Sequence, residues 1–325
     1  MELETMSDNR TTKKMPSKTN DRNRIAGNSS RLPRWIRECL AELVGTYFLI
    51  MVGDCSVANY KLHRGSKVGV DHFAVAFTFG IAAMIGIAAS SPISGSHLNP
   101  AVTVAFAIIK KLPFRKIPHY FLGQYLGAFL AAVTVFFTYQ EGITAYDGGE
   151  RIAYNVENET LNSISTGVIF ATYPAPWVTV VGTLIDQIIA TFALVFSVMA
   201  VTNHKAKLPD YLHPFMLGMV ICAMVVAFGL NCGAALNPAR DLSPRIFLAI
   251  SGYGLDAFKP VNSLYWLTAG IIGPHIGAII GAWSYSYLLH YDDDDDDDDT
   301  NRNAYIVNGD DNQISTPVLI KHNKQ

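Results

Sequence analysis

The sequence predicts an all-α membrane protein with six transmembrane helices and two re-entrant half-helices, arranged as an inverted internal repeat. Three observations support this fold class: few charged residues, apolar segments of spanning length, and one tripeptide that occurs at equivalent places in both halves. Half of the 325 residues are hydrophobic and only 16% are charged, whereas soluble domains average about 25% charged residues. The net charge of −2 gives no reason to expect a nucleic-acid partner.

Six apolar segments are long enough to cross the hydrocarbon core of a lipid bilayer, which takes about 20 helical residues. They cover residues 36–59, 71–91, 117–138, 178–201, 212–230 and 264–289. Two shorter apolar runs, 97–109 and 237–250, would each cover roughly 15–20 Å as a helix and end near the bilayer midplane. We therefore expect one membrane domain over residues 34–290 that contains both re-entrant helices.

Polar segments flank this domain. Residues 1–33 are rich in Lys, Arg, Asn and Ser, and residues 291–325 include eight consecutive aspartates at 292–299. Both segments are expected to be disordered. Basic residues gather in the N-terminal segment, at 110–116 and at 205–207, and the positive-inside rule places all three in the cytoplasm, together with both termini. The loop 139–177 is then extracellular, and Asn158 in the sequon Asn-Glu-Thr is a glycosylation candidate.

The two halves of the chain repeat one another. Asn99-Pro100-Ala101 and Asn237-Pro238-Ala239 each open one of the short apolar runs, and Gly80 and Gly218 precede them at the same distance. Each half contains three spans, so the second copy must enter the membrane in the opposite orientation. The two half-helices are therefore expected to approach the midplane from opposite faces.

The repeated tripeptide suits a helix that begins inside a membrane. Proline at the first helical position lacks an N–H that would have had no partner, and asparagine before it is a favoured cap. If Asn99 and Asn237 face a lumen, their amides offer two adjacent donors where both helix dipoles place positive charge. A water molecule that accepts from both would interrupt a proton-conducting chain, and the positive field would repel cations. A single tripeptide could be a simple cap, but two at equivalent positions favour a pore.

Charged residues in or beside the spans are expected to be functional, because an unpartnered charge in a membrane is costly. Arg240 follows the second tripeptide and is expected at an extracellular-side constriction, where it donates to solute oxygens and repels cations. Asp241 is expected to pair with Arg240 or with Arg245. Glu42, in the first span, is expected to accept backbone N–H bonds from a re-entrant loop; a role as a proton relay is the alternative.

Segments 94–103 and 229–245 resemble the two signature motifs of the major intrinsic proteins, or aquaporins. Asp241 and Arg245 after the second motif, the run 170–176 and the long segment 250–262 resemble the glycerol-conducting branch, the aquaglyceroporins. The resemblance covers about residues 35–290. It implies a homotetramer in the plasma membrane with one pore in each subunit, and it makes His97, inside the first motif, a supporting residue of the pore.

The resemblance also implies a selectivity constriction of four residues: Phe79, Val225, Ala234 and Arg240. Val225 stands where water-selective members usually have histidine, so the constriction should be wider and more apolar. Phe79 can then face the carbon backbone of glycerol while Arg240 binds its hydroxyls.

Three residues depart from the usual pattern of the branch and leave the solute range open. Ala234 stands where several glycerol channels have an aromatic residue, and Gly270 stands where proline is usual. Gln187, expected to support the second re-entrant loop, replaces the second copy of the glutamate Glu42.

The expected function is passive diffusion of water, glycerol and other small uncharged solutes such as urea, with exclusion of protons and ions. A water-selective channel with little glycerol flux is the first alternative, followed by a proton-coupled transporter and a non-conducting scaffold. The sequence of the membrane domain shows no metal-ligand cluster, nucleophile pair or phosphate-binding loop. We therefore expect no enzyme activity, no metal and no cofactor.

Overall fold

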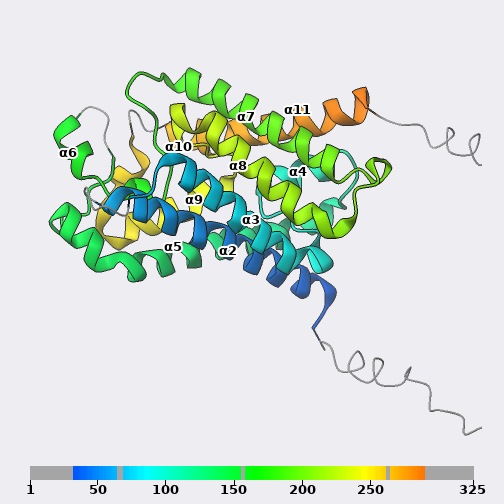
Figure 1. The fold of residues 1–325 in the computed structure, drawn as a ribbon, viewed down its shortest axis with the longest axis horizontal. Coiled ribbons are helices and arrows are strands. Elements are labelled where there is room, and N and C mark those ends of the chain that lie inside the picture. The colour runs from blue at the N-terminus through cyan, green and yellow to red at the C-terminus, as the bar shows by residue number, and fades with distance from the viewer. Residues whose placement is uncertain (1–31, 64–68, 155–157, 261–263, 290–325) are drawn as a thin grey trace, which may run out of the picture.

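The protein is described by a computed structural model that covers residues 32–63, 69–154, 158–260 and 264–289 (Figure 1). Within these ranges the chain forms helices joined by turns and loops, without a β-strand. The two tails expected to be disordered, 1–33 and 291–325, lie outside the described residues except for residues 32 and 33.

Six helical segments of the described chain are long and apolar enough to cross a membrane, in agreement with the prediction. Five are α2 (Arg34–Leu62), α3 (His72–Ser94), α5 (Ile117–Asp147), α7 (Val180–Val201) and α8 (His213–Cys232). The sixth, Tyr265–Leu288, consists of α10 (Tyr265–Leu267), a π-helical turn (Thr268–Ile272) and α11 (Gly273–Leu288). The two short apolar runs form α4 (Pro100–Ile108) and α9 (Pro238–Leu248).

Helix α5 is longer than the apolar pattern predicted, because it continues through polar residues to Asp147. The side chain of Asp147 is buried and accepts hydrogen bonds from Arg151 Nη1 at 3.0 Å and from Thr166 Oγ1 at 2.9 Å. Gly148, with φ of 71°, then ends the helix in the left-handed conformation. The following loop contains a short helix, α6 (Glu159–Ile164), which Asn158 caps by accepting from the Leu161 N–H.

The two half-helices occupy opposite halves of the molecule. In Figure 1, α4 lies in the half that contains the start of α2 and the end of α11, and α9 lies in the other half. Helix α4 packs against α11 and α9 packs against α5, so the last span of each repeat covers the half-helix of the other repeat. This exchange holds the two repeats together and brings the N-termini of α4 and α9 into contact.

Close helix contacts depend on glycines at equivalent places in the two repeats. Helices α3 and α8 cross at Gly80 and Gly218, the two glycines that precede the repeated tripeptides at the same distance. A Cβ added to Gly80 would lie 2.7 Å from the carbonyl oxygen of Gly218, and one added to Gly218 would lie 2.6 Å from the carbonyl oxygen of Gly80. Small residues let membrane helices approach this closely because packing, rather than water exclusion, drives their association.

Gly80→Ala should lower the thermal unfolding midpoint of the purified protein, because the added methyl group would separate α3 from α8 at a cost of about 1–3 kcal/mol. Gly142→Ala is the matched control, since a Cβ there meets only the end of the Leu62 side chain, at 3.3 Å. Fluorescence-monitored unfolding in detergent measures both variants. Equal midpoints for the two variants would contradict the role given to the Gly80–Gly218 contact.

Candidate pore

The two asparagines of the repeated tripeptide cap the half-helices. Asn99 Oδ1 accepts from the backbone N–H of Ala101 at 2.9 Å, and Asn237 Oδ1 accepts from that of Ala239 at 3.0 Å. Pro100 and Pro238 occupy the first helical positions. N–H groups that would be unpaired at the start of each helix are thereby satisfied by the residue that precedes it.

The same two asparagines tie the repeats together. Asn99 Nδ2 donates to the Leu236 carbonyl at 3.0 Å, and Asn237 Nδ2 donates to the Leu98 carbonyl at 2.7 Å. Each carboxamide has two N–H donors, so one holds the opposite loop and the second is available to a solute. This symmetric exchange fixes the two helix N-termini head to head.

Both re-entrant loops adopt the same unusual backbone conformation. Ser96, Leu98, Ala234 and Leu236 all have φ between 50° and 56°, a left-handed region that residues other than glycine rarely enter. Such strain persists where the surrounding structure fixes the conformation, and it is concentrated at functional sites. The similarity of these four φ angles shows that the two loops repeat in structure as well as in sequence.

A cavity of about 110 Å³ lies at the meeting point of the two half-helices. Its wall contains both capping asparagines, His97 and all four residues of the predicted constriction: Asn99, Asn237, His97, Phe79, Val225, Ala234 and Arg240. Much of the remaining wall is aliphatic, including Leu49, Ile87, Leu194 and Ile221. A liquid water occupies about 30 Å³, so the cavity can hold a short file of water molecules between polar and apolar sides.

Arg240 is held in the cavity wall by its surroundings and is only 8% exposed. Its Nη1 donates to the Phe170 carbonyl at 3.0 Å, and its guanidinium carbon lies 5.3 Å from the centre of the Phe79 ring. The ring and the cation attract one another at this distance. Arg240 and Phe79 therefore fix each other's positions in the cavity wall.

Glu42 lies behind the cavity wall and braces the first re-entrant loop. Its two carboxylate oxygens accept from the backbone N–H groups of His97 at 2.9 Å and Leu98 at 2.7 Å. Ser94 Oγ and Gln124 Nε2 also donate to it, at 2.6 Å and 2.8 Å. Four donors on a fully buried carboxylate leave it no contact with the cavity, so its geometry is that of a brace.

Gln187 occupies the equivalent place in the second repeat. Its Oε1 accepts from the Leu236 N–H at 2.8 Å, and its Nε2 donates to Asp186 Oδ2 at 2.9 Å. Asp186 also accepts from Asn231 Nδ2 and from Cys232 Sγ. The second loop is thus braced by an amide and a neighbouring carboxylate, whereas one glutamate serves the first loop.

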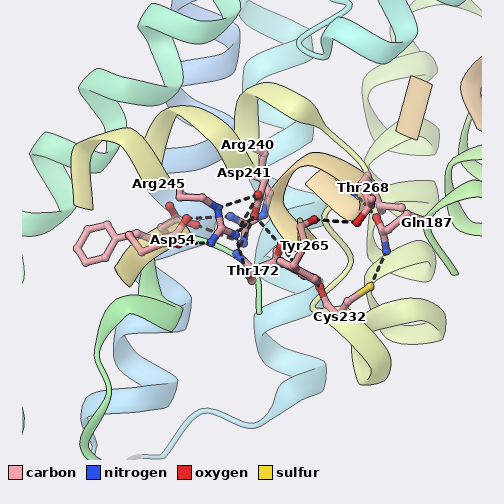
Figure 2. Close-up of polar contacts among 12 residues, drawn as sticks. Asp54, Thr172, Gln187, Cys232, Arg240, Asp241, Arg245, Tyr265 and Thr268 are labelled. Carbon is pink, nitrogen blue, oxygen red and sulfur yellow. Dashed lines mark hydrogen bonds and ion pairs between the residues drawn. The ribbon is translucent and has the colours of Figure 1, made fainter. Parts of the chain in front are cut away.

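Of the two partners that the sequence left open for Asp241, the structure selects Arg245. Arg245 is fully buried, and its Nη2 lies 2.9 Å from Asp241 Oδ1 while its Nε lies 3.1 Å from Oδ2 (Figure 2). Asp241 also accepts from Thr172 N and Oγ1 at 2.9 Å and 2.6 Å. This pair binds the loop between α5 and α7 to α9 and so places the Phe170 carbonyl beside Arg240.

Gly270 makes room for the buried pair. A Cβ at this position would lie 2.6 Å from Asp241 Oδ2, so the glycine that departs from the family pattern allows the last span to pass directly over the carboxylate. The glycosylation candidate Asn158 is exposed in the loop after α5 and takes no part in the cavity wall.

Sequence reasoning missed two neighbours of Arg240, Phe170 and Asp54. Phe170 acts through its backbone carbonyl, which side-chain patterns cannot reveal. Asp54 is fully buried in α2, and its Oδ1 lies 3.7 Å from Arg240 Nη2. The signal for Asp54 was available, because an ionisable residue inside a span is by itself a functional candidate.

Asp241→Asn should destabilise the protein by about 3–5 kcal/mol, since it leaves the buried Arg245 without a countercharge. Asp241→Asn combined with Arg245→Met removes both charges and should recover most of that loss. Thermal unfolding of the single and double variants in the same detergent measures the difference. A single variant as stable as the parent protein would show that the pair does not hold the loop.

Comparison with known proteins identifies relatives along most of the chain. The family model named Major intrinsic protein matches residues 29–285. Human aquaporin-9 is 38% identical over 250 residues, which are 77% of this chain and 81% of that protein. Human aquaporin-10 is 34% identical over 254 residues, 78% of this chain and 81% of that protein.

Aquaglyceroporin-2 from Rhizophagus irregularis is 32% identical over 256 residues and covers 78% of each chain. Among solved structures, the X-ray structure of the aquaglyceroporin from Plasmodium falciparum superposes with a TM-score of 0.68 at 28% identity. That superposition covers 79% of this chain and 97% of the other. The family match contains the first five spans, both half-helices and the sixth span up to residue 285, and the chain therefore belongs to the major intrinsic protein family, the aquaporins.

Proposed function

We propose that this protein is a passive channel for water, glycerol and other small uncharged solutes such as urea, and that it excludes protons and ions. One observation carries the proposal: a single cavity is lined by both capping asparagines and by Arg240 next to Phe79 and Val225. Hydrogen-bond donors on one side and apolar surface on the other match a polyol, which carries its hydroxyls along a carbon chain. The relatives that are named aquaglyceroporins agree with this reading.

The residues opposite Arg240 favour glycerol over water alone. Val225 provides an aliphatic wall where an imidazole would narrow the opening and add a polar group, and Ala234 adds little volume. Phe79 lies against the guanidinium, so a solute that donates and accepts at Arg240 can pass its carbons over the ring. A narrow, fully polar constriction would fit a water-selective channel better.

Proton exclusion follows from the positive charge and the hydrogen-bond donors at the centre of the cavity. The positive ends of α4 and α9 meet there, each equivalent to roughly half a charge, and the asparagine amides donate to any oxygen that passes. Waters on either side must then direct their hydrogens away from the centre. Glu42, whose oxygens are taken by four protein donors, supports a channel rather than a proton-coupled transporter.

Proteoliposomes in a glycerol gradient should re-swell much faster with this protein than protein-free vesicles of the same composition. Stopped-flow light scattering measures the rate. Rapid water flux without glycerol entry would contradict the proposed conduction of glycerol and support a water-selective channel.

In the same assay, Val225→His should reduce the glycerol rate more than the water rate, because a ring at this position narrows the constriction. Val225→Leu, which stays aliphatic, separates the effect of volume from that of polarity. If Val225→His reduced both rates equally, Val225 would not lie at the selective point.

We further propose that four copies assemble in the plasma membrane, each with its own pore and with both termini in the cytoplasm. Helix α8 supports assembly, because 22% of its apolar window is buried within the chain, against 44–50% for the other spans. It therefore presents much of its surface to lipid or to a second copy. Light scattering coupled to chromatography of the detergent-solubilised protein gives the subunit number, and a mass of one subunit would contradict the tetramer.

The orientation predicts a glycan at Asn158. When the protein is made in eukaryotic cells, glycosidase treatment should increase its electrophoretic mobility, and Asn158→Gln should abolish the change. A glycosidase-sensitive shift that persists in Asn158→Gln would place another segment outside and contradict the topology.

A further inference from the structure

Asp54 is a buried carboxylate for which the pore described above gives no role. It lies in the apolar helix α2 and is fully buried, yet neither of its oxygens accepts a hydrogen bond from any residue that the structure describes. The other fully buried carboxylates differ in this respect, since Glu42 and Asp241 each accept several. A buried charge without hydrogen bonds needs a countercharge to be stable.

Arg240 is the cation that lies close enough to provide one. Its Nη2 is 3.7 Å from Asp54 Oδ1, and Figure 2 shows both side chains in the charged cluster around α9. Arg240 lines the cavity whereas Asp54 does not, so the carboxylate lies behind the arginine as seen from the lumen. The neighbouring acid Asp241 is engaged by Arg245 and Thr172, which leaves the charge of Arg240 to Asp54.

The separation of these two groups matters for function. At 3.7 Å the pair is an ion pair but is longer than a hydrogen bond, for which N···O is about 2.7–3.2 Å. The carboxylate therefore compensates the charge of the guanidinium without occupying its N–H donors. One donor binds the Phe170 carbonyl, and the remainder can serve a solute in the cavity.

We propose that Asp54 is the countercharge of Arg240 and determines the charge selectivity of the constriction; this inference rests on the proposed channel function. The two residues together carry no net charge, so the constriction suits neutral polar solutes and concentrates neither anions nor cations. Loss of Asp54 leaves a positive constriction that attracts small monovalent anions. Loss of Arg240 leaves a carboxylate beside the lumen and attracts monovalent cations.

The test compares ion selectivity in planar bilayers or proteoliposomes under a potassium chloride gradient. Three variants are needed: Asp54→Asn, Arg240→Ala and the double variant with both changes. The parent protein should add no ion conductance, whereas Asp54→Asn should add one that reverses near the chloride potential and Arg240→Ala one that reverses near the potassium potential. In the double variant the potassium flux should fall by about tenfold or more relative to Arg240→Ala, because the attracting charge is gone.

Asp147→Asn is the matched control, because it neutralises a carboxylate of similar burial that pairs with Arg151 at the end of α5. Like the parent protein, this variant should add no ion conductance to the membrane. A purely structural role of Asp54 would not reverse the sign of ion selectivity, so the sign separates the two roles.

The test still gives an answer when one of the single variants fails to fold. If Asp54→Asn cannot be purified, the comparison of Arg240→Ala with the double variant decides the question, and if Arg240→Ala cannot be purified, Asp54→Asn decides it. Potassium flux in the double variant equal to that in Arg240→Ala would overturn the proposal, as would Asp54→Asn that passes glycerol without gaining chloride flux. A parent protein that passes neither water nor glycerol would refute the channel function itself and is thus a distinguishable result.

Discussion

Two helices that begin in the middle of a bilayer would each leave backbone N–H groups unpaired where water is scarce, and the whole fold depends on how these groups are satisfied. Asn99 and Asn237 meet part of the need by capping their own helices and by donating to the opposite loop. Because each cap also binds the other repeat, neither half-helix can be placed alone. The pore centre is therefore the point at which the two repeats complete each other.

The two repeats brace their loops with different chemistry, although their backbones match. Glu42 binds two consecutive N–H groups of the first loop with one carboxylate. In the second repeat Gln187 binds the Leu236 N–H, and its own amide is held by Asp186. The backbones of the two re-entrant loops are thus symmetric, whereas the side chains that support them differ between the repeats.

Patterns that are local in sequence were enough to predict most of the fold. Apolar length located the spans, and the proline after each asparagine located the starts of α4 and α9. The end of α5 could not be found this way, because Asp147 is stabilised by Arg151 and Thr166 after the helix has left the apolar region.

Contacts between segments that are distant in sequence limited how much of the candidate site could be predicted. The resemblance to the aquaporins pointed to residues that line the cavity, but the choice of Arg245 as the partner of Asp241 required the positions of Thr172 and the loop around it. Asp54 and Arg240 are far apart in sequence and meet only in the folded chain, where Asp54 of α2 lies 3.7 Å from Arg240 at the start of α9. Their pairing turns a single positive charge at the constriction into a neutral pair, which suits the uncharged solutes proposed for the channel.

The head-to-head helix N-termini are proposed to let neutral molecules pass while they interrupt proton transfer. Simultaneous measurement of water and proton flux in proteoliposomes, with light scattering and an enclosed pH-sensitive dye, tests it most directly. If the channel excludes protons, water flux should be rapid and the proton permeability should equal that of protein-free vesicles. Proton entry that rises in proportion to the amount of reconstituted protein would contradict it.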